Sequence, residues 1–67
     1  MSDLGTISLV EDVNNIMSFE GLSSDEDKLD TIISLYPNMR TGSSCFFYDT
    51  KKVKMYEKTT NTWIQIN

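Results

Sequence analysis

Residues 42–66 read Gly42-Ser43-Ser44-Cys45-Phe46-Phe47-Tyr48-Asp49-Thr50-Lys51-Lys52-Val53-Lys54-Met55-Tyr56-Glu57-Lys58-Thr59-Thr60-Asn61-Thr62-Trp63-Ile64-Gln65-Ile66, and this stretch decides the fold that the sequence predicts. Aromatic and β-branched residues gather in three short runs, as they do in strands. Asp49 and Asn61 lie between the runs, and both residue types suit tight turns. We therefore expect three antiparallel strands, at about residues 44–48, 53–58 and 62–66.

The alternation of side chains assigns a face to each strand residue. In the first strand, Cys45 and Phe47 point one way, and Phe46 and Tyr48 point the other way. Both faces are apolar, so we expect a helix to cover one face and a partner protein to cover the other. Four aromatic residues are the candidate interface: Phe46, Tyr48 and Tyr56, expected on one sheet face, and Trp63.

A helix is expected over residues 23–35. Ser23 and Ser24 are suitable N-caps, and the acidic run 25–27 places negative charge where the helix dipole favours it. Four apolar side chains then share one helix face: Leu29, Ile32, Ile33 and Tyr36. Pro37 disfavours a helical conformation at Tyr36, so we expect the helix to end near Leu35.

The first 22 residues give a weaker pattern. Residues 6–10 suit a short strand or an extended arm. Val10, Val13, Ile16 and Met17 recur at helical spacing, which predicts one or two helical turns within residues 11–19. The predicted fold is therefore an α+β class domain spanning residues 1–67. It has a small three-stranded antiparallel meander at about residues 44–66, and one or two short helices packed against it. Residues 1–22 are either part of this domain or an arm that partners order.

Chain length limits the stability that one core can provide. A domain of 67 residues buries about 60% of its unfolded surface, so its core is marginal. Cys45 is the only cysteine and the chain has no histidine, which excludes an internal disulfide and disfavours a structural zinc site. Association with other chains is the favoured source of extra stability, and a core that is just sufficient is the alternative.

Charge is divided unevenly along the chain. Residues 1–30 carry eight acids and one base, a net charge of −7, and residues 31–67 carry five bases and two acids, a net charge of +3. One interpretation is solubility together with attraction between the two halves of one fold. The other is head-to-tail association of copies, with the acidic half of one copy against the basic half of the next.

No pattern in the sequence indicates catalysis or a cofactor. An EF-hand starting at Asp25 needs Gly at its sixth position and Glu at its twelfth, but Asp30 and Tyr36 stand there. We interpret the acidic run as a solvated helix start. Cys45 lacks a histidine base and follows the apolar strand pattern, so we expect a buried structural thiol. We expect no enzyme activity, no metal and no cofactor.

Two binding interpretations start from the same sheet. Lysines 51, 52, 54 and 58 beside the aromatic residues resemble a surface for single-stranded nucleic acid, but the acidic chain disfavours phosphates. Lysine also protects strand edges from aggregation, which we favour. Trp63 could stack on a sugar or anchor an interface, and a core position is the favoured interpretation.

Residues 29–66 resemble a short module of small structural proteins in tailed bacteriophages and phage tail-like particles. The resemblance lies in Leu35-Tyr36-Pro37, Thr41-Gly42-Ser43, Cys45-Phe46-Phe47, Asp49-Thr50-Lys51-Lys52-Val53, Met55-Tyr56 and Trp63. It implies a virion component, such as a head fibre, collar, tail or baseplate accessory, that joins a larger particle in many copies. It implies no catalytic residue.

The expected function is thus a non-enzymatic structural protein of a virion or phage-like particle, bound to other particle proteins or to its own copies. The alternative is a small acidic phage-encoded module that binds and inhibits a host protein. Residues 1–5 lack the features of a signal peptide, and no segment approaches the roughly 20 apolar residues that span a bilayer. We therefore expect a complete product made in the bacterial cytoplasm, without membrane contact.

Overall fold

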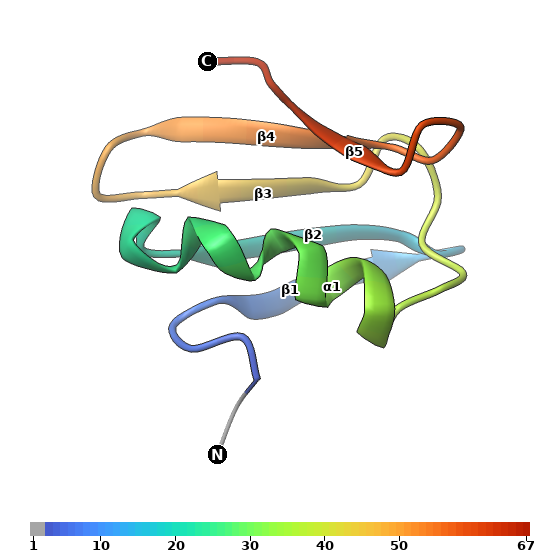
Figure 1. Cartoon of the computed structure of the whole chain (residues 1–67), viewed down its shortest axis with the longest axis horizontal. Helices are drawn as coiled ribbons and strands as arrows, with labels where there is room; N and C mark the ends of the chain where they lie inside the picture. The colour runs from blue at the N-terminus through green and yellow to red at the C-terminus, as the bar shows by residue number, and fades with distance from the viewer. Residues whose placement is uncertain (1–2) are drawn as a thin grey trace.

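The computed structural model describes residues 3–67 and contains one mixed sheet with one short helix. Its elements are β1 (Ser8–Val13), β2 (Ile16–Gly21), the 3₁₀ segment η1 (Ser23–Lys28), α1 (Leu29–Leu35), β3 (Ser44–Phe47), β4 (Lys52–Glu57) and β5 (Thr62–Gln65). The strands lie side by side in the order in which they occur along the chain (Figure 1).

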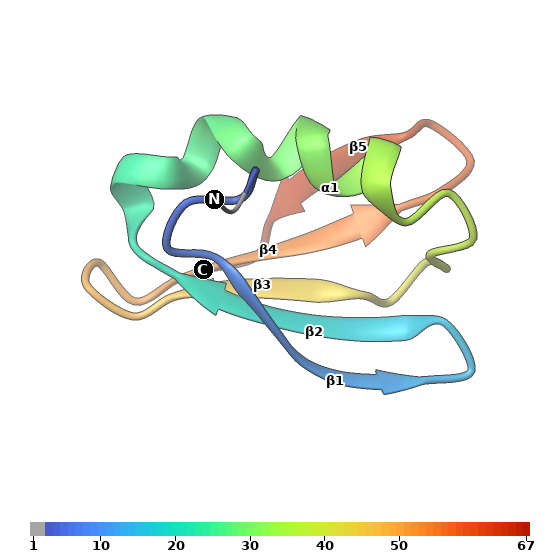
Figure 2. The same ribbon diagram turned by 90° about the horizontal axis from the view of Figure 1, so that it is seen from below.

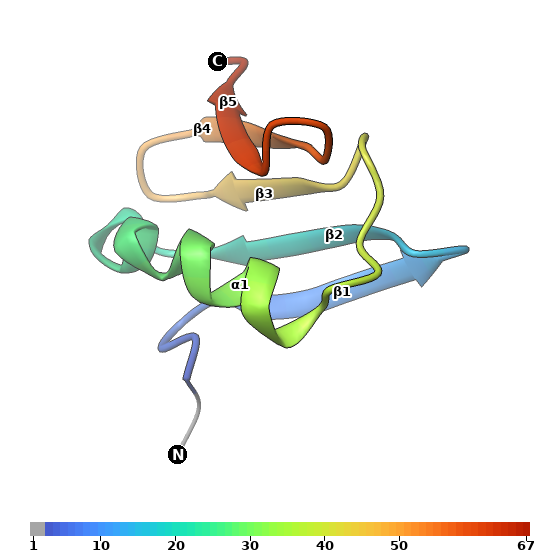
Figure 3. The same ribbon diagram turned by 45° about the vertical axis from the view of Figure 1, so that its right-hand side comes forward.

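The sheet has one parallel pair at its centre. β1 and β2 form an antiparallel hairpin, β3, β4 and β5 pair antiparallel in sequence, and β2 and β3 run parallel. A parallel pair needs a long crossover. Here η1, α1 and the loop after them cross in front of the sheet and return the chain to the start of β3 (Figure 3).

The expected three-stranded antiparallel meander is wrong, because the described chain forms a five-stranded mixed sheet. The α+β class is confirmed, and the three expected strands match β3, β4 and β5 with ends that differ by about one residue. The error lies in the first 22 residues. Residues 11–19, expected to be helical, form the β1–β2 hairpin instead. Met1 and Ser2, which begin the segment we considered as an arm, lie outside the described residues.

The hairpin forms because Asn14 and Asn15 adopt positive φ angles of 54° and 69°. A two-residue turn with two positive φ angles matches the twist of paired strands, and asparagine tolerates this conformation well. The Asp12 carboxylate accepts a hydrogen bond of 3.0 Å from the Asn15 N–H and closes the turn. The apolar spacing that resembled a helix therefore belongs to two strands.

The expected helix is divided into the 3₁₀ segment and α1, and its serines do not cap it. Ser23 instead donates its hydroxyl to Asp49 at 2.7 Å. Asp25 accepts 2.8 Å and 2.7 Å hydrogen bonds from the N–H and hydroxyl of Thr6. We interpreted residues 25–27 as a solvated helix start, and this is wrong for Asp25. Its carboxylate joins the N-terminal segment at Thr6 to η1 through these two hydrogen bonds.

The core lies on one face of the sheet only. Ten apolar residues form it: Leu4, Ile7, Met17, Phe19, Leu29, Ile32, Met39, Cys45, Phe47 and Tyr56. η1, α1 and the N-terminal segment cover this face, whereas no helix or strand of the described chain covers the opposite face (Figure 2). Burial of Cys45 is confirmed.

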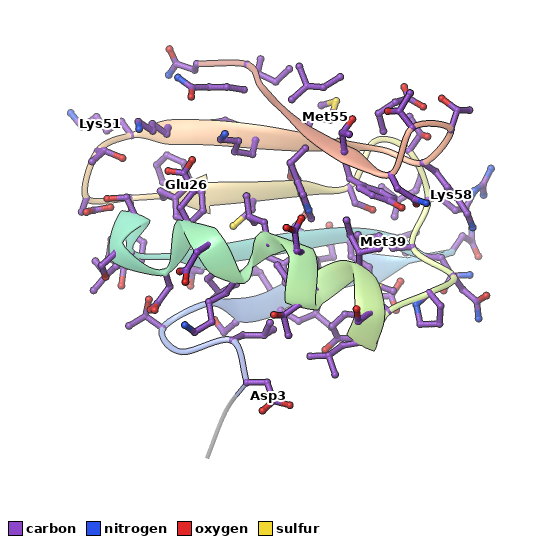
Figure 4. All side chains as sticks on the ribbon, in the orientation of Figure 1. Asp3, Glu26, Met39, Lys51, Met55 and Lys58 are labelled. Carbon is purple, nitrogen blue, oxygen red and sulfur yellow. The ribbon has the colours of Figure 1, made fainter. Side chains whose placement is uncertain are left out.

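Some of the acidic and basic side chains form ion pairs with each other within one molecule. Glu26 is a residue of η1, and its side chain extends toward β4 (Figure 4). Its carboxylate oxygens lie 3.1 Å from the Lys54 amine and 3.8 Å from the Lys52 amine. These ion pairs join the acidic and basic halves of one molecule. They favour the interpretation in which the halves attract each other inside one fold.

Ser43 is the one polar residue that is fully buried among the described residues. Its hydroxyl accepts the Met17 N–H at 2.9 Å and donates to the Arg40 carbonyl at 2.8 Å. Met17 directly precedes Ser18, which is paired with Ser44 at the start of the parallel ladder. The hydroxyl therefore extends the β2–β3 pairing by one residue and joins it to the crossover loop.

We expect Ser43→Ala to lower the free energy of unfolding by about 1–3 kcal/mol, because it leaves the buried Met17 N–H without an acceptor. Urea denaturation followed by circular dichroism measures the change. Ser44→Ala, at the adjacent half-buried position, is the matched control and should cost less. Equal stability of Ser43→Ala and wild type would contradict the role assigned to this hydroxyl.

Three carboxylates have lowered pKa values because they accept hydrogen bonds. The pKa of Asp25 is lowered chiefly by the Thr6 hydroxyl and then by the Thr6 N–H. The Ser23 hydroxyl and N–H lower the pKa of Asp49 in the same way, and Thr59 lowers that of Glu57. A lowered folded-state pKa stabilises the fold above the unfolded value, and this contribution is lost as pH falls through the folded value.

We expect the free energy of unfolding to decline as pH falls below the ordinary Asp pKa of 3.8. Asp49→Asn should be less stable than wild type at neutral pH, and its stability should decline less in acid, because the titrating acceptor is gone. Urea unfolding from about pH 6 to pH 2 measures both slopes. Glu11→Gln, which changes an exposed carboxylate of β1, is the control for the loss of one acidic group. Parallel curves for Asp49→Asn and wild type would refute the assignment.

Candidate functional site

The uncovered sheet face carries a group of apolar side chains from three adjacent strands, all exposed except the half-buried Val53. We call it the open-face patch, and its members are Phe46 of β3, Val53 and Met55 of β4, Ile64 of β5, and Ile66 just after β5. Phe46, Met55, Ile64 and Ile66 are 41%, 38%, 50% and 59% exposed. Scattered exposed apolar residues are ordinary, but a contiguous group on one face marks an interaction surface.

Strand register brings the patch together. Phe46 is paired with Val53, and Met55 is paired with Ile64. The Ile66 N–H donates to the Val53 carbonyl at 2.8 Å, which places Ile66 beside the same strand residue. Side chains of directly paired residues lie on the same face about 5 Å apart, so the five residues form one continuous surface.

The chain places the four predicted interface residues in different environments. Phe46 belongs to the open-face patch, and Tyr48 is 50% exposed just beyond the end of β3. Tyr56 is only 3% exposed on the helix-covered face, and its hydroxyl donates to Asn61 at 2.6 Å. Trp63 is half-buried beside Tyr56 with a ring separation of 5.4 Å. Phe46 and Tyr56 therefore do not share the face that we expected.

Sequence reasoning missed four members of the patch: Val53, Met55, Ile64 and Ile66. The aromatic residues drew the interface prediction, although aromatic rings are also the largest contributors to a core. The alternation of side chains along residues 62–66 contains the signal that finds the two isoleucines, because it puts Ile64 and Ile66 on the face opposite Trp63. Once Trp63 is assigned to the core side, the two isoleucines must lie on the other face.

A groove of about 310 Å³ lies on the helix side of the sheet, where η1 and α1 meet β4 and β5. It is lined by Glu26, Asp27, Leu29, Asp30, Lys54, Asn61, Thr62 and Trp63. The Trp63 indole N–H donates to the Leu29 carbonyl at 3.0 Å and so fixes one wall. Three acids and one lysine give the groove an acidic character.

Two observations on the described residues concern metal binding and nucleophilic chemistry. No group of three or more Cys, Asp or Glu side chains within residues 3–67 is placed to hold a metal ion. Burial, with a smaller effect from the charge of Glu26, raises the pKa of the Cys45 thiol to about 12. A thiol with so high a pKa forms almost no thiolate, the nucleophilic form, at neutral pH. Within the same residues, no helix has the length and apolar character needed to cross a membrane.

No family model, no curated protein and no solved structure matches the chain. The open-face patch and the acidic groove are the two surfaces of the described residues to which a function can be assigned.

We expect Cys45 to resist a thiol reagent such as 5,5′-dithiobis(2-nitrobenzoate) at pH 8 in the folded protein, because the thiol is buried and protonated. In urea the same thiol should react at the rate of a free cysteine. Absorbance of the released thionitrobenzoate measures both rates. An exposed-cysteine variant, Ser8→Cys, serves as a control with one thiol that reacts at once. Equally fast reaction of Cys45 in folded and unfolded protein would contradict its assigned environment.

Proposed function

We propose that this protein is a non-enzymatic structural component that joins a larger protein assembly by burying its open-face patch. The observation that supports the proposal is the continuous apolar surface on a sheet face that no other element of the described chain covers. Burial of exposed apolar surface is the main driving force for association. Catalysis plays no part in the proposal.

The size of the surface sets the form of the contact. A stable interface buries about 800 Å² on each partner. Such a contact would cover about a fifth of the protein's total accessible surface of 4204 Å². The contact must therefore extend beyond the patch to the polar residues around it, including Ser44 and Glu20 on the same face. An apolar centre with a polar rim is typical of specific protein interfaces.

The proposed setting is a virion or phage-like particle in a bacterial host. This part of the proposal is supported by the resemblance of residues 29–66 to small phage structural proteins. The partners would be other particle proteins, further copies of the chain, or both, and each particle would carry many copies. The regulatory alternative, inhibition of a host protein, uses the same face with a different partner.

We expect wild type to associate in solution or to bind purified particles, and Phe46→Ser/Met55→Thr to do neither. The two changes remove apolar area from the centre of the patch, and threonine retains strand propensity. Sedimentation across a concentration and salt series measures self-association, and co-sedimentation with particles measures docking. Val10→Thr is the matched control, because Val10 is 59% exposed on β1 and lies apart from the patch.

Mass spectrometry of purified particles then tests the setting directly, by detecting the chain and its copy number. A wild type that stays monomeric at all concentrations and binds no particle protein would overturn the structural proposal. Specific capture of one host protein, lost in Phe46→Ser/Met55→Thr, would replace it with the regulatory alternative.

A further inference from the structure

The two edges of the sheet are protected to different degrees. β1 has a register shift between Leu9 and Glu11, and it carries Glu11 and Asp12. Bulges and charges of this kind block the addition of another strand. β5 carries neither charge nor proline, and its register with β4 is continuous from Thr62 to Gln65. Its length of four residues is its one form of protection, and the edge otherwise stays open to a partner strand.

The outward hydrogen-bonding groups of β5 can be assigned from its pairing with β4. The Ile66 N–H donates inward to the Val53 carbonyl. Inward and outward groups alternate along an antiparallel edge strand, so the N–H and C=O groups of Ile64 also point toward β4. The groups of Trp63 and Gln65 therefore point away from the sheet. They form a short unpaired template for one more strand.

The acidic groove lies beside this template, on the face of β5 that carries Trp63. Glu26 is committed to Lys54 at 3.1 Å. Asp27 has a side chain that is 77% exposed and only a long 3.9 Å contact with Lys28. Asp30 is exposed on α1. Asp27 and Asp30 thus leave negative charge at the groove. The opposite face of β5 carries the apolar Ile64 and Ile66 of the open-face patch.

We propose that the edge of β5 binds an extended segment of a different protein in which basic and apolar residues alternate. The segment pairs with the outward backbone groups of Trp63 and Gln65. Its basic side chains enter the groove toward Asp27 and Asp30, and its apolar side chains continue the open-face patch beyond Ile64. Backbone pairing supplies affinity in this mode of recognition, and the alternating side chains supply specificity.

Charge complementarity argues against a second copy of the chain at this edge. Pairing β5 with the β1 of another copy would bring one acid of β1, Glu11 or Asp12, to an acidic groove, because these neighbours point to opposite faces of the strand. Pairing β5 with another β5 would bring two acidic grooves together. Both arrangements place like charges close to each other, which disfavours association. A basic partner segment gains attraction at the same position.

A peptide titration tests the proposal, and the single tryptophan of the chain reports on it, because Trp63 lines the groove. The probe is a blocked peptide, Thr-Lys-Val-Lys-Val-Lys-Thr, and Trp63 emission is followed at low salt. We expect saturable binding that weakens as salt is added. The charge-reversed peptide Thr-Glu-Val-Glu-Val-Glu-Thr should not bind. The lysine peptide with N-methyl groups on every residue should not bind either, because it has no backbone donor for strand pairing on either edge.

Variants of the edge separate backbone pairing from charge. Gln65→Pro removes an outward N–H and leaves the inward pairing to β4, a position where an edge strand tolerates proline. It should weaken peptide binding at least about fivefold, the equivalent of one lost hydrogen bond of about 1 kcal/mol, whereas Gln65→Thr should bind like wild type. Asp27→Asn/Asp30→Asn should weaken binding about two- to tenfold and reduce its salt dependence.

The outcomes that overturn this inference differ from those that overturn the proposed function. Equal binding of the lysine, glutamate and N-methylated peptides would refute strand addition at β5, even if Gln65→Pro failed to fold. Strand addition would also be refuted if a folded Gln65→Pro variant bound the lysine peptide as tightly as wild type. The choice of a different protein as partner would be refuted if wild type self-associated and Gln65→Pro did not. Phe46→Ser/Met55→Thr leaves β5 intact. If this variant no longer docks to particles but still binds the lysine peptide, the open-face patch and the β5 edge are two separate binding surfaces.

Discussion

The pairing of β2 with β3 is the constraint on which the rest of the structure depends. It is the only parallel contact in the described sheet, and it joins the N-terminal hairpin to the C-terminal antiparallel strands. Ser43 secures one end of this contact through Met17, and the Tyr48 N–H donates to the Gly21 carbonyl at the other end. Each half alone is a small sheet with little to bury its apolar face, and such sheets are marginal in water. The pairing makes one surface wide enough for the crossover to cover.

The crossover between β2 and β3, made of η1, α1 and the loop after them, covers only one face of the sheet. The open-face patch and the acidic groove both result from this one-sided cover. Leu29 and Ile32 of the seven-residue helix α1 belong to the same buried core as Phe19, Cys45 and Phe47. The acidic groove remains where η1 and α1 meet β5. The opposite face keeps its apolar centre at Phe46 and Met55, because the chain contains no further segment to cover it within the described residues. A small fold thus presents two different surfaces beside the same edge strand.

Local patterns predicted the C-terminal half well, because its signals are local. Alternation predicted the three strands, and Asn61 adopts a positive φ angle of 53° in the turn that was expected there. The N-terminal half was misjudged because Val13, Ile16 and Met17 fit a helical period as well as a strand hairpin, and only the Asn14–Asn15 turn distinguishes them. The parallel pairing and the roles of Asp25 and Ser43 depend on residues up to 26 positions apart in sequence. No short window of sequence contains such information. The interface prediction placed Tyr56 on the wrong face for a different reason: alternation alone did not give the register in which Phe46 pairs with Val53 and so shares a face with Met55.

The topology also sets the order in which a growing chain can fold. The β1–β2 hairpin closes a two-residue turn and can form as soon as Gly21 has left the ribosome. Its apolar residues Met17 and Phe19 then have no complete core until β3 emerges, because Phe19 is paired with Cys45. Translation of the intervening residues takes on the order of seconds at about 5–20 residues per second. For that interval the nascent hairpin is exposed to chaperones and to neighbouring chains, so the fold is completed only after β3 has followed the hairpin out of the ribosome.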